Sequence, residues 1–333
     1  MITHAYRYTT LRTIPVVFTI HNGQYQGLMD WEHAGLLPAF DPHVSGLLDW
    51  DGLINPLASA IKCCWRYTTV SPGYLQELFR NSGGLSHLFM MEQPKGYGIL
   101  NGIHTAVWNP STDRMLIRQY NSRTVKKGKA VNKQDLCARY QLDERKPLIA
   151  FIGRLVGEKG ADLLPEIISR SLADMRGGVN FLVLGSGEKF IEYELKELNE
   201  KHPEACAVYI GYNEELSHQV YAAADFLLMP SRVEPCGLNQ LYSLRYGTMP
   251  VVCSTGGLKD TVLDFDEDAN GYGIRFDEAT VMSACTAVRR AVGLYGEPAR
   301  LSGFRKTMMA LDFSWQHAAG QYMNLYKTLK PIE

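Results

Sequence analysis

The stretch LIAFIGRLVGEKGADLLPEIISRSLADM, residues 148–175, decides the fold, because an apolar run of strand length leads through a glycine-containing turn into an amphipathic helix. Gly177 and Gly178 follow and predict the end of that helix. The alternation continues downstream, with strands expected at NFLVLG from Asn180, AVYIG from Ala207, FLLMP from Phe226 and PVVCS from Pro250, and helices near 190–201, 216–224 and 238–246. This repetition predicts a doubly wound parallel sheet.

A different sheet is expected nearer the start of the chain, where PVVFTIHN from Pro15 and the end of KCCWRYTTVS from Lys62 are strand candidates, followed by a helix near 73–80. Residues 109–133 are polar and carry seven lysines and arginines, which favours a solvated connector. Residues 314–329 predict a helix. We therefore predict an α/β protein with domains over 1–112 and 113–314 and a terminal helix within 315–333.

Composition narrows the class of function. The 333 residues suffice for two domains, and 34 basic against 35 acidic side chains leave a net charge of −1, which disfavours nucleic acid or an anionic membrane as the partner. The longest apolar stretches are far shorter than the ~20 residues of a spanning helix. Seven cysteines show no metal-finger or redox spacing and no secretory segment opens the chain, so we expect reduced thiols in a cytoplasmic protein.

The turn from Gly153 to Gly160, GRLVGEKG, places Arg154 and Lys159 between a strand and a helix. Backbone N–H groups at such a turn, together with two cations, suit a phosphate group. The alternative is a surface turn with solvated cations.

A second candidate stretch begins with SRVEPCGLNQLY at Ser231. Glu234 stands just before an expected helix start, where a carboxylate can accept hydrogen bonds from ligand hydroxyls; its alternative role is to interact with the helix dipole. Gly256 and Gly257 then form another strand-to-helix turn, with N–H groups expected to be free. Open α/β sheets bind ligands at such turns.

His21 and Asn101 are weaker candidates. His21 ends an expected strand before Gly23, and Asn101 lies among glycines in GILNGIH. Each side chain could bind sugar hydroxyls, but a structural histidine and a turn asparagine are the more ordinary interpretations.

Taken in order, the segments FTIHNGQYQG, TTVSPGYLQEL, GILNGIHTAVWNPSTD, GRLVGEKGADLL, IGYNEELSH, PSRVEPCGLNQLYSLRYGTMPVV, STGGLKDTV and FSWQHAAGQYMNLY resemble the bacterial glycogen synthases and plant starch synthases over nearly the whole chain. The resemblance implies an enzyme with two facing Rossmann-like domains (GT-B type). Residues 1–112 would belong to the acceptor-side domain and 113–314 to the nucleotide-sugar domain, with the terminal helix crossing back. Such an enzyme is a retaining hexosyltransferase, which moves glucose from ADP-glucose to the non-reducing end of an α-1,4-glucan such as glycogen.

The resemblance also implies roles for individual residues. Arg154 and Lys159 would hold the diphosphate, so that neither a metal nor another cofactor is expected, and Glu234 would bind the donor sugar. His21 would lie over the donor glucose. The other donor-binding residues implied are a base-stacking tyrosine, the loop beside the sugar, the second glycine turn and a connector amide, namely Tyr212, Cys236, Gly237, Leu238, Gly256, Gly257 and Asn101.

Two departures from the family pattern stand out. Tyr242 occupies the place where the wider superfamily has a second glutamate. The resemblance implies that glycogen synthases tolerate the absence of this glutamate. The family's Lys-Thr-Gly-Gly loop does not precede Met1, so we expect an incomplete N-terminal domain with exposed apolar edges that invite association. The alternative to the active enzyme is therefore a truncated, catalytically impaired fragment that binds nucleotide or glucan. A pyridoxal-phosphate-dependent glucan phosphorylase and a sugar-nucleotide epimerase are disfavoured, since no motif supports either.

Overall fold

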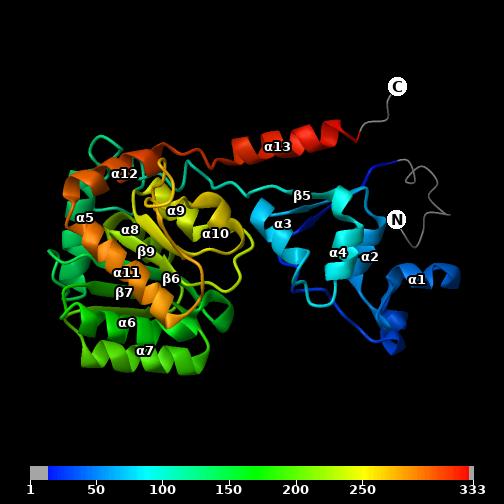
Figure 1. The fold of residues 1–333 in the computed structure, drawn as a ribbon, viewed down its shortest axis with the longest axis horizontal. Coiled ribbons are helices and arrows are strands. Elements are labelled where there is room, and N and C mark those ends of the chain that lie inside the picture. Colours follow the sequence, from blue (N-terminus) through cyan, green and yellow to red (C-terminus); the bar gives the residue numbers. More distant parts are fainter. Residues whose placement is uncertain (1–13, 330–333) are drawn as a thin grey trace. The chain divides into compact units, whose positions relative to one another are not determined.

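The computed structural model describes residues 14–329, and the contacts between residues divide the chain into two compact units (Figure 1). One unit comprises Met1–Asn101 with Gln316–Glu333, and the other comprises Gly102–Trp315. The contact-based division falls earlier than the domain boundary expected between residues 112 and 113. Trp108 and Asp113 contact residues of the larger unit, which explains the difference.

The larger unit is built on a six-stranded sheet in which every neighbouring pair of strands is parallel, in the order β11-β10-β9-β6-β7-β8. The strands are β6 (Leu148–Leu155), β7 (Asn180–Gly187), β8 (Cys206–Ile210), β9 (Phe226–Met229), β10 (Met249–Cys253) and β11 (Ile274–Phe276). The first five confirm the strands expected from the apolar runs. The sequence analysis did not anticipate β11, whose three residues are too short to show a period.

Helices cover both faces of this sheet (Figure 1). They are α5 (Val125–Arg139), α6 (Leu164–Asp174), α7 (Lys189–Lys201), α8 (Glu214–Ala223), α9 (Asn239–Arg245), α10 (Gly256–Thr261), α11 (Val281–Tyr295) and α12 (Pro298–Ala310), with short 3-10 turns η6 (Gly157–Lys159) and η7 (Ala161–Leu163). Successive residues of β6 enter opposite cores: Ile149 packs with α6, α7 and α11, whereas Ala150 packs with α5 and α8. Two cores on one sheet confirm the doubly wound fold.

The solvated connector expected over residues 109–133 is wrong in its second half, because α5 begins at Val125. Lys129 is 2% exposed, and its Nζ donates to the carbonyl oxygens of Tyr221 and Ala222 and to the hydroxyl of Thr248. Burial lowers the pKa of Lys129 well below its usual value. The chain tolerates this buried lysine because backbone carbonyl oxygens and a hydroxyl accept hydrogen bonds from it, an arrangement that a count of charges along the sequence does not reveal.

A buried carboxylate pairs with a second buried lysine of α5, Lys133. Asp225 Oδ2 lies 2.6 Å from Lys133 Nζ, and Asp225 Oδ1 lies 2.6 Å from Arg305 Nη2. Burial by itself raises the pKa of Asp225, but the two cations outweigh burial and lower it. The three side chains tie α5 and α12 to the start of β9.

The smaller unit contains a three-stranded parallel sheet in the order β1-β4-β5. Its strands are β1 (Val17–Ile20), β4 (Arg66–Thr69) and β5 (Gly96–Gly98), with a short hairpin of β2 (Asp49–Trp50) and β3 (Leu53–Ile54). Its helical segments are η3 (Trp31–Leu36), η4 (Pro42–Val44), α1 (Ser45–Leu48), α2 (Pro56–Cys63), α3 (Pro72–Leu78), α4 (Ser86–Met91), η5 (Gln93–Lys95) and α13 (Trp315–Lys327). The expected strands at 15–22 and 62–71 and the expected helices near 73–80 and 314–329 are confirmed. Among the helices of residues 14–329, none has the length and apolar character needed to cross a membrane.

Candidate active site

The turn after β6 is shaped by a glycine that packs against the loop after β9. Gly160 has φ +65°, and a Cβ at this position would overlap the carbonyl oxygen of Pro230. Only glycine combines that backbone conformation with so close an approach. The two loops are therefore held together, which brings Lys159 beside Glu234.

Lys159 and Glu234 form an ion pair that is largely covered by protein. Lys159 Nζ lies 2.8 Å from Glu234 Oε1 and 3.5 Å from a Glu158 oxygen, and Ser231 Oγ donates to Glu234 Oε2 over 3.2 Å. The side chains of Lys159 and Glu234 are 18% and 10% exposed. Arg154 is 57% exposed and lies 3.4 Å from Glu158. A cation, a carboxylate and a hydroxyl thus converge where a ligand carrying both phosphate and hydroxyl groups can be bound.

The loop from residue 231 to 238 supports this pair through its backbone. The Gly257 N–H donates to the carbonyl oxygen of Glu234 over 3.0 Å, so the expectation that this N–H is free is wrong. A Cβ on Gly257 would overlap the carbonyl oxygen of Cys236, which is 5% exposed. Gly257 thus holds the start of α10 against the loop. Gly256 begins α10, and Gly237 adopts φ +72° beside the side chain of Gln240.

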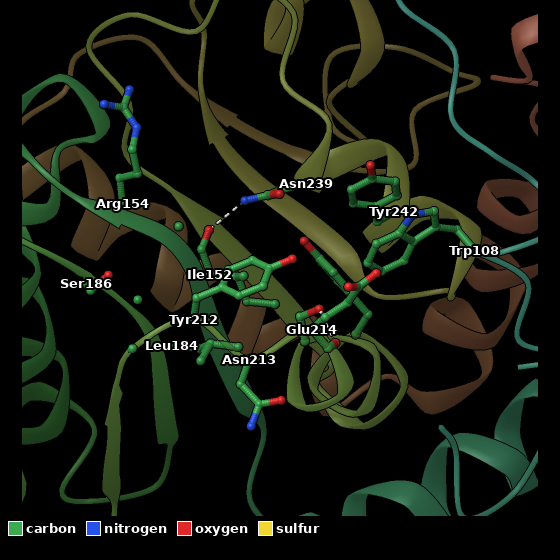
Figure 2. Close-up of a pocket in the computed structure, with 15 residues that line it drawn as sticks. Trp108, Ile152, Arg154, Leu184, Ser186, Tyr212, Asn213, Glu214, Asn239 and Tyr242 are labelled. Atoms are coloured by element: carbon green, nitrogen blue, oxygen red, sulfur yellow. Dashed lines mark hydrogen bonds between the residues drawn. The ribbon is translucent and has the colours of Figure 1, made fainter. Parts of the chain in front are cut away.

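Two hollows open at the carboxyl ends of the central strands and share Ile152, Gly153, Arg154 and Asn239 in their walls. One, of about 300 Å³, is lined by Lys159, Ser231, Glu234 and Leu238. The other, of about 370 Å³, is lined by Trp108, Tyr212, Glu214 and Tyr242 (Figure 2). In the sheet, β7 and β8 lie to one side of β6, whereas β9, β10 and β11 lie to its other side, so the strand order reverses at β6. The hollows therefore lie at the topological switch point, where open α/β sheets bind ligands.

The second hollow has an aromatic wall and an exposed ring. Tyr212 follows β8, is 86% exposed and extends among the lining residues in Figure 2. Trp108 stacks on Tyr242 with 3.8 Å between ring centroids and 19° between ring planes. Flat aromatic faces of this kind suit a nucleobase.

Asn239, Trp108 and Tyr242 are among the lining residues that the sequence analysis did not assign to the site. Asn239 Nδ2 donates to the carbonyl oxygen of Ile152 over 2.6 Å, the bond dashed in Figure 2, and so joins α9 to the end of β6 between the hollows. Trp108 stood inside a quoted motif without a role, and Tyr242 was noted only as a departure. The turn geometry around Asn239 was the available signal, since it directly follows the Gly237-Leu238 pair.

His21 and Asn101 belong to the other unit. His21 directly follows β1 and is exposed, and Asn101 is the last residue of that unit's first segment. Their roles stay predictions.

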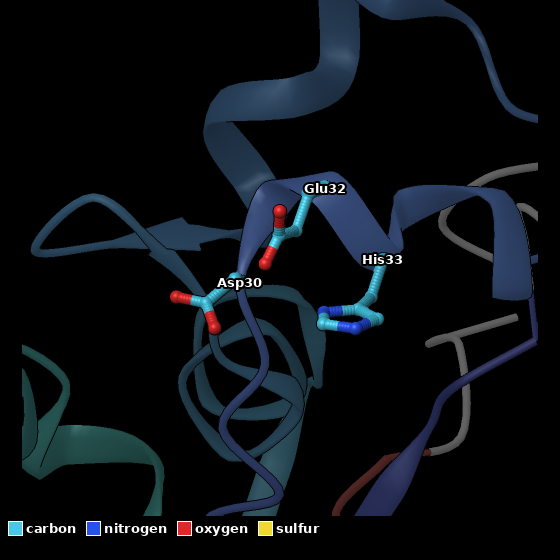
Figure 3. A group of neighbouring side chains, drawn as sticks. All are labelled: Asp30, Glu32 and His33. Atoms are coloured by element: carbon cyan, nitrogen blue, oxygen red, sulfur yellow. The ribbon is translucent and has the colours of Figure 1, made fainter.

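A metal site is poorly supported. In residues 14–329, the side chains close enough to share an ion are Asp30, Glu32 and His33, whose ligand atoms lie within 4.8 Å of one another (Figure 3). All three are exposed on or beside one short helical turn, η3. Residues adjacent in sequence meet this spacing without any bound ion, so the cluster indicates no metal site.

Comparisons with known proteins agree with this geometry. A family model described as "Starch synthase catalytic domain" matches residues 1–91, and one described as "Glycosyl transferases group 1" matches residues 132–291. A glycogen synthase of Flavobacterium johnsoniae is 45% identical over 325 residues, which cover 98% of this chain and 68% of that protein. A glycogen synthase of Rhodospirillum rubrum is 40% identical, with 96% and 66% covered. The chain thus spans about two thirds of the length of these relatives.

Among solved structures, the catalytic domain of starch synthase IV from Arabidopsis thaliana, bound to ADP and acarbose, superposes with a TM-score of 0.88. It is 33% identical, with 98% of this chain and 70% of that chain covered. Anabaena HepE in complex with UDP-glucose has a TM-score of 0.63 at 13% identity, a likeness of fold alone. The predicted α/β fold of GT-B type and the resemblance stated from the motifs are confirmed.

Proposed function

The chain belongs to the glycogen and starch synthase family of glycosyltransferases, and from that premise we propose that it transfers glucose from ADP-glucose to the non-reducing end of an α-1,4-glucan with retention of configuration. The observation that carries the proposal is the Lys159–Glu234 pair at the switch point, beside a hollow with aromatic walls. The Lys159–Glu234 pair suits the diphosphate and sugar of a nucleotide sugar, and the aromatic hollow suits its base.

Lys159 and Arg154 supply the positive charge for the leaving diphosphate. Negative charge accumulates on the departing phosphate as the bond to glucose breaks, so cations fixed beside it stabilise the transition state more than the ground state. Lys159 is held by Glu234, whereas the exposed Arg154 is free to turn toward a ligand. Because two cations supply this charge, the proposal requires neither a metal ion nor pyridoxal phosphate.

Glu234 orients the sugar. One of its oxygens pairs with Lys159, and the other accepts from Ser231 in a geometry that a sugar hydroxyl can share. The same carboxylate therefore links the position of the glucose to that of the lysine at the phosphate.

Retention follows if the acceptor attacks on the face from which the diphosphate leaves. The bond between the anomeric carbon and the phosphate oxygen breaks, and a bond from that carbon to the acceptor oxygen forms. The acceptor's hydroxyl proton moves to the departing phosphate oxygen, so that atoms and charge balance without a covalent intermediate on the protein.

Tyr212 and the Trp108–Tyr242 wall would hold the base of the donor between flat surfaces. Stacking suits any base, so the adenine preference within this proposal rests on the ADP bound by the Arabidopsis relative. A cytoplasmic location is proposed on cysteine usage. All seven thiols are free and six are buried, and burial raises the pKa of Cys206 to about 12.

A second candidate, nucleotide binding without transfer, is favoured by one observation: the residues lining both hollows all lie within Gly102–Trp315. One experiment separates the two. ADP release from ADP-glucose by the purified 333-residue chain is measured with and without glycogen, with UDP-glucose as the control donor. Glycogen-dependent release supports transfer; ADP binding without release supports the second candidate.

A further inference from the structure

Three rings from distant parts of the chain form one continuous stack behind the aromatic hollow. Trp108 lies between His218 of α8, at 3.8 Å and 13°, and Tyr242 of α9, at 3.8 Å and 19°. Tyr221 and Tyr246 meet Trp108 edge-on, at 5.7 Å and 6.3 Å between centroids. Trp108 is therefore confined on both faces and along its edges.

Only the front of this stack reaches the hollow. Trp108 and Tyr242 line the cavity of about 370 Å³, and Figure 2 shows their rings side by side at its edge. His218 is 1% exposed and does not line the cavity. His218 can therefore affect a ligand in this cavity only indirectly, through its stacking contact with Trp108.

The back of the stack is fixed by hydrogen bonds. Asp113 Oδ2 lies 2.7 Å from His218 Nδ1 and accepts from the Tyr246 hydroxyl over 2.5 Å, while Asp113 Oδ1 accepts from the backbone N–H of Met115 over 2.9 Å. Burial alone raises the pKa of Asp113, but these hydrogen bonds outweigh it and lower that pKa, which keeps the carboxylate ionised.

The same bonds determine the orientation of the imidazole. An ionised carboxylate only accepts, so His218 Nδ1 carries a hydrogen and donates it to Asp113 Oδ2. Within the described residues, His218 Nε2 is buried with no hydrogen-bond partner. A plain apolar ring would fill this space without burying that unpaired nitrogen, and the polar ring gains in return a fixed tilt.

We propose that His218 is a positioning residue for the donor's nucleobase: anchored by Asp113, it sets the tilt of Trp108 and, through Trp108, presents Tyr242 as a preformed wall of the base pocket. The inference rests on the proposed function, since it assigns the aromatic hollow to the base. A wall already ordered before binding spares the ligand the cost of ordering it.

Two substitutions separate the functions of the imidazole. His218→Asn keeps a donor close to the position of Nδ1 but removes the stacking face. His218→Phe keeps the face but removes the donor to Asp113. If His218 only fills space, His218→Phe behaves as wild type; if it positions the wall, both variants bind the base less well.

The readout is calorimetric affinity for ADP compared with pyrophosphate, in the full chain. Pyrophosphate uses the Arg154–Lys159 turn and lacks a base. We expect ADP affinity to fall about fivefold to tenfold in both variants, the range that aromatic stacking contributes, with pyrophosphate affinity unchanged. His87→Asn, an exposed histidine on α4, is the matched control and should change neither affinity.

Wild-type ADP affinity in a folded His218→Phe, or a parallel loss of both affinities, overturns the inference. If neither His218 variant folds, Trp108→Phe, which keeps a ring in the stack, is judged by the same comparison. Wild-type chain that binds ADP without transferring glucose contradicts the proposed transfer and leaves this inference intact. Wild-type chain that binds none of ADP, UDP and GDP overturns it.

Discussion

Replacing Lys159 by alanine removes the covered cation of the site while leaving its backbone turn in place. Lys159 Nζ is 2.8 Å from Glu234 Oε1 and the side chain is 18% exposed, so the charge acts in a partly dehydrated setting. At an effective dielectric constant of about 20, two unit charges ~4 Å apart interact by about 4 kcal/mol. Between half and all of a unit charge appears on the leaving phosphate, which gives about 2–4 kcal/mol, or roughly a 30- to 1,000-fold loss of kcat.

The assay couples ADP release to a spectrophotometric signal at saturating glycogen, with ADP-glucose varied to separate kcat from KM. We expect the loss mainly in kcat, because the interaction strengthens as the bond breaks. Lys189→Ala is the matched control: Lys189 also pairs with a glutamate at 2.8 Å, but its side chain is 89% exposed and lines neither hollow.

A Lys159→Ala variant with kcat within threefold of wild type and an unchanged melting temperature would refute the assignment of Lys159 to the leaving group. A loss confined to KM would show that the lysine contributes only ground-state binding.

Three further predictions concern neighbouring features. Glu234→Gln keeps the size of the side chain but loses the charge that pairs with its lysine, and should lower kcat/KM about 10- to 100-fold while ADP inhibition changes less than threefold; equal losses in both measurements would contradict a sugar-binding role. Asp225→Asn leaves two buried cations without their carboxylate and should lower the free energy of unfolding by about 3–5 kcal/mol in urea titrations. Because the native pKa of Asp225 is lowered, that stabilisation is present above its unfolded pKa of about 3.9 and is lost as pH falls through the native value. The unfolding free energies of the wild-type chain and of Asp225→Asn should therefore converge in acid. A difference that stays constant with pH would contradict the role of the Asp225 charge. Gly257→Ala should destabilise by about 1–3 kcal/mol in thermal unfolding, since its Cβ meets a backbone carbonyl, whereas Gly293→Ala in α11, where a Cβ meets nothing within 4 Å, should not destabilise.

Local patterns predicted most of the larger unit. A strand buried on both faces is apolar along its whole length, so β6, β7 and β9 were visible as runs. The motif series also identified the family. β11 was missed because three residues do not make a pattern.

Charge patterning failed where tertiary contacts override it. The lysines of α5 predicted a solvated segment, yet Lys129 and Lys133 are buried because carbonyl oxygens and Asp225 from elsewhere in the chain accept hydrogen bonds from them. The N–H of Gly257 was expected to be free for a ligand, but the fold uses it to hold the carbonyl of Glu234. Both errors concern which partner a polar group finds.

The sequence by itself determined five of the six strands of the larger sheet, the glycine turns and the family, because these follow from residues within a few positions of one another. Only the tertiary structure decided that Lys159 meets Glu234, 75 residues away, and that Trp108 lies between His218 and Tyr242. Such contacts depend on how the helices pack against the sheet. Packing brings together side chains that are far apart in the sequence, and a local sequence pattern does not indicate which distant residues will be in contact.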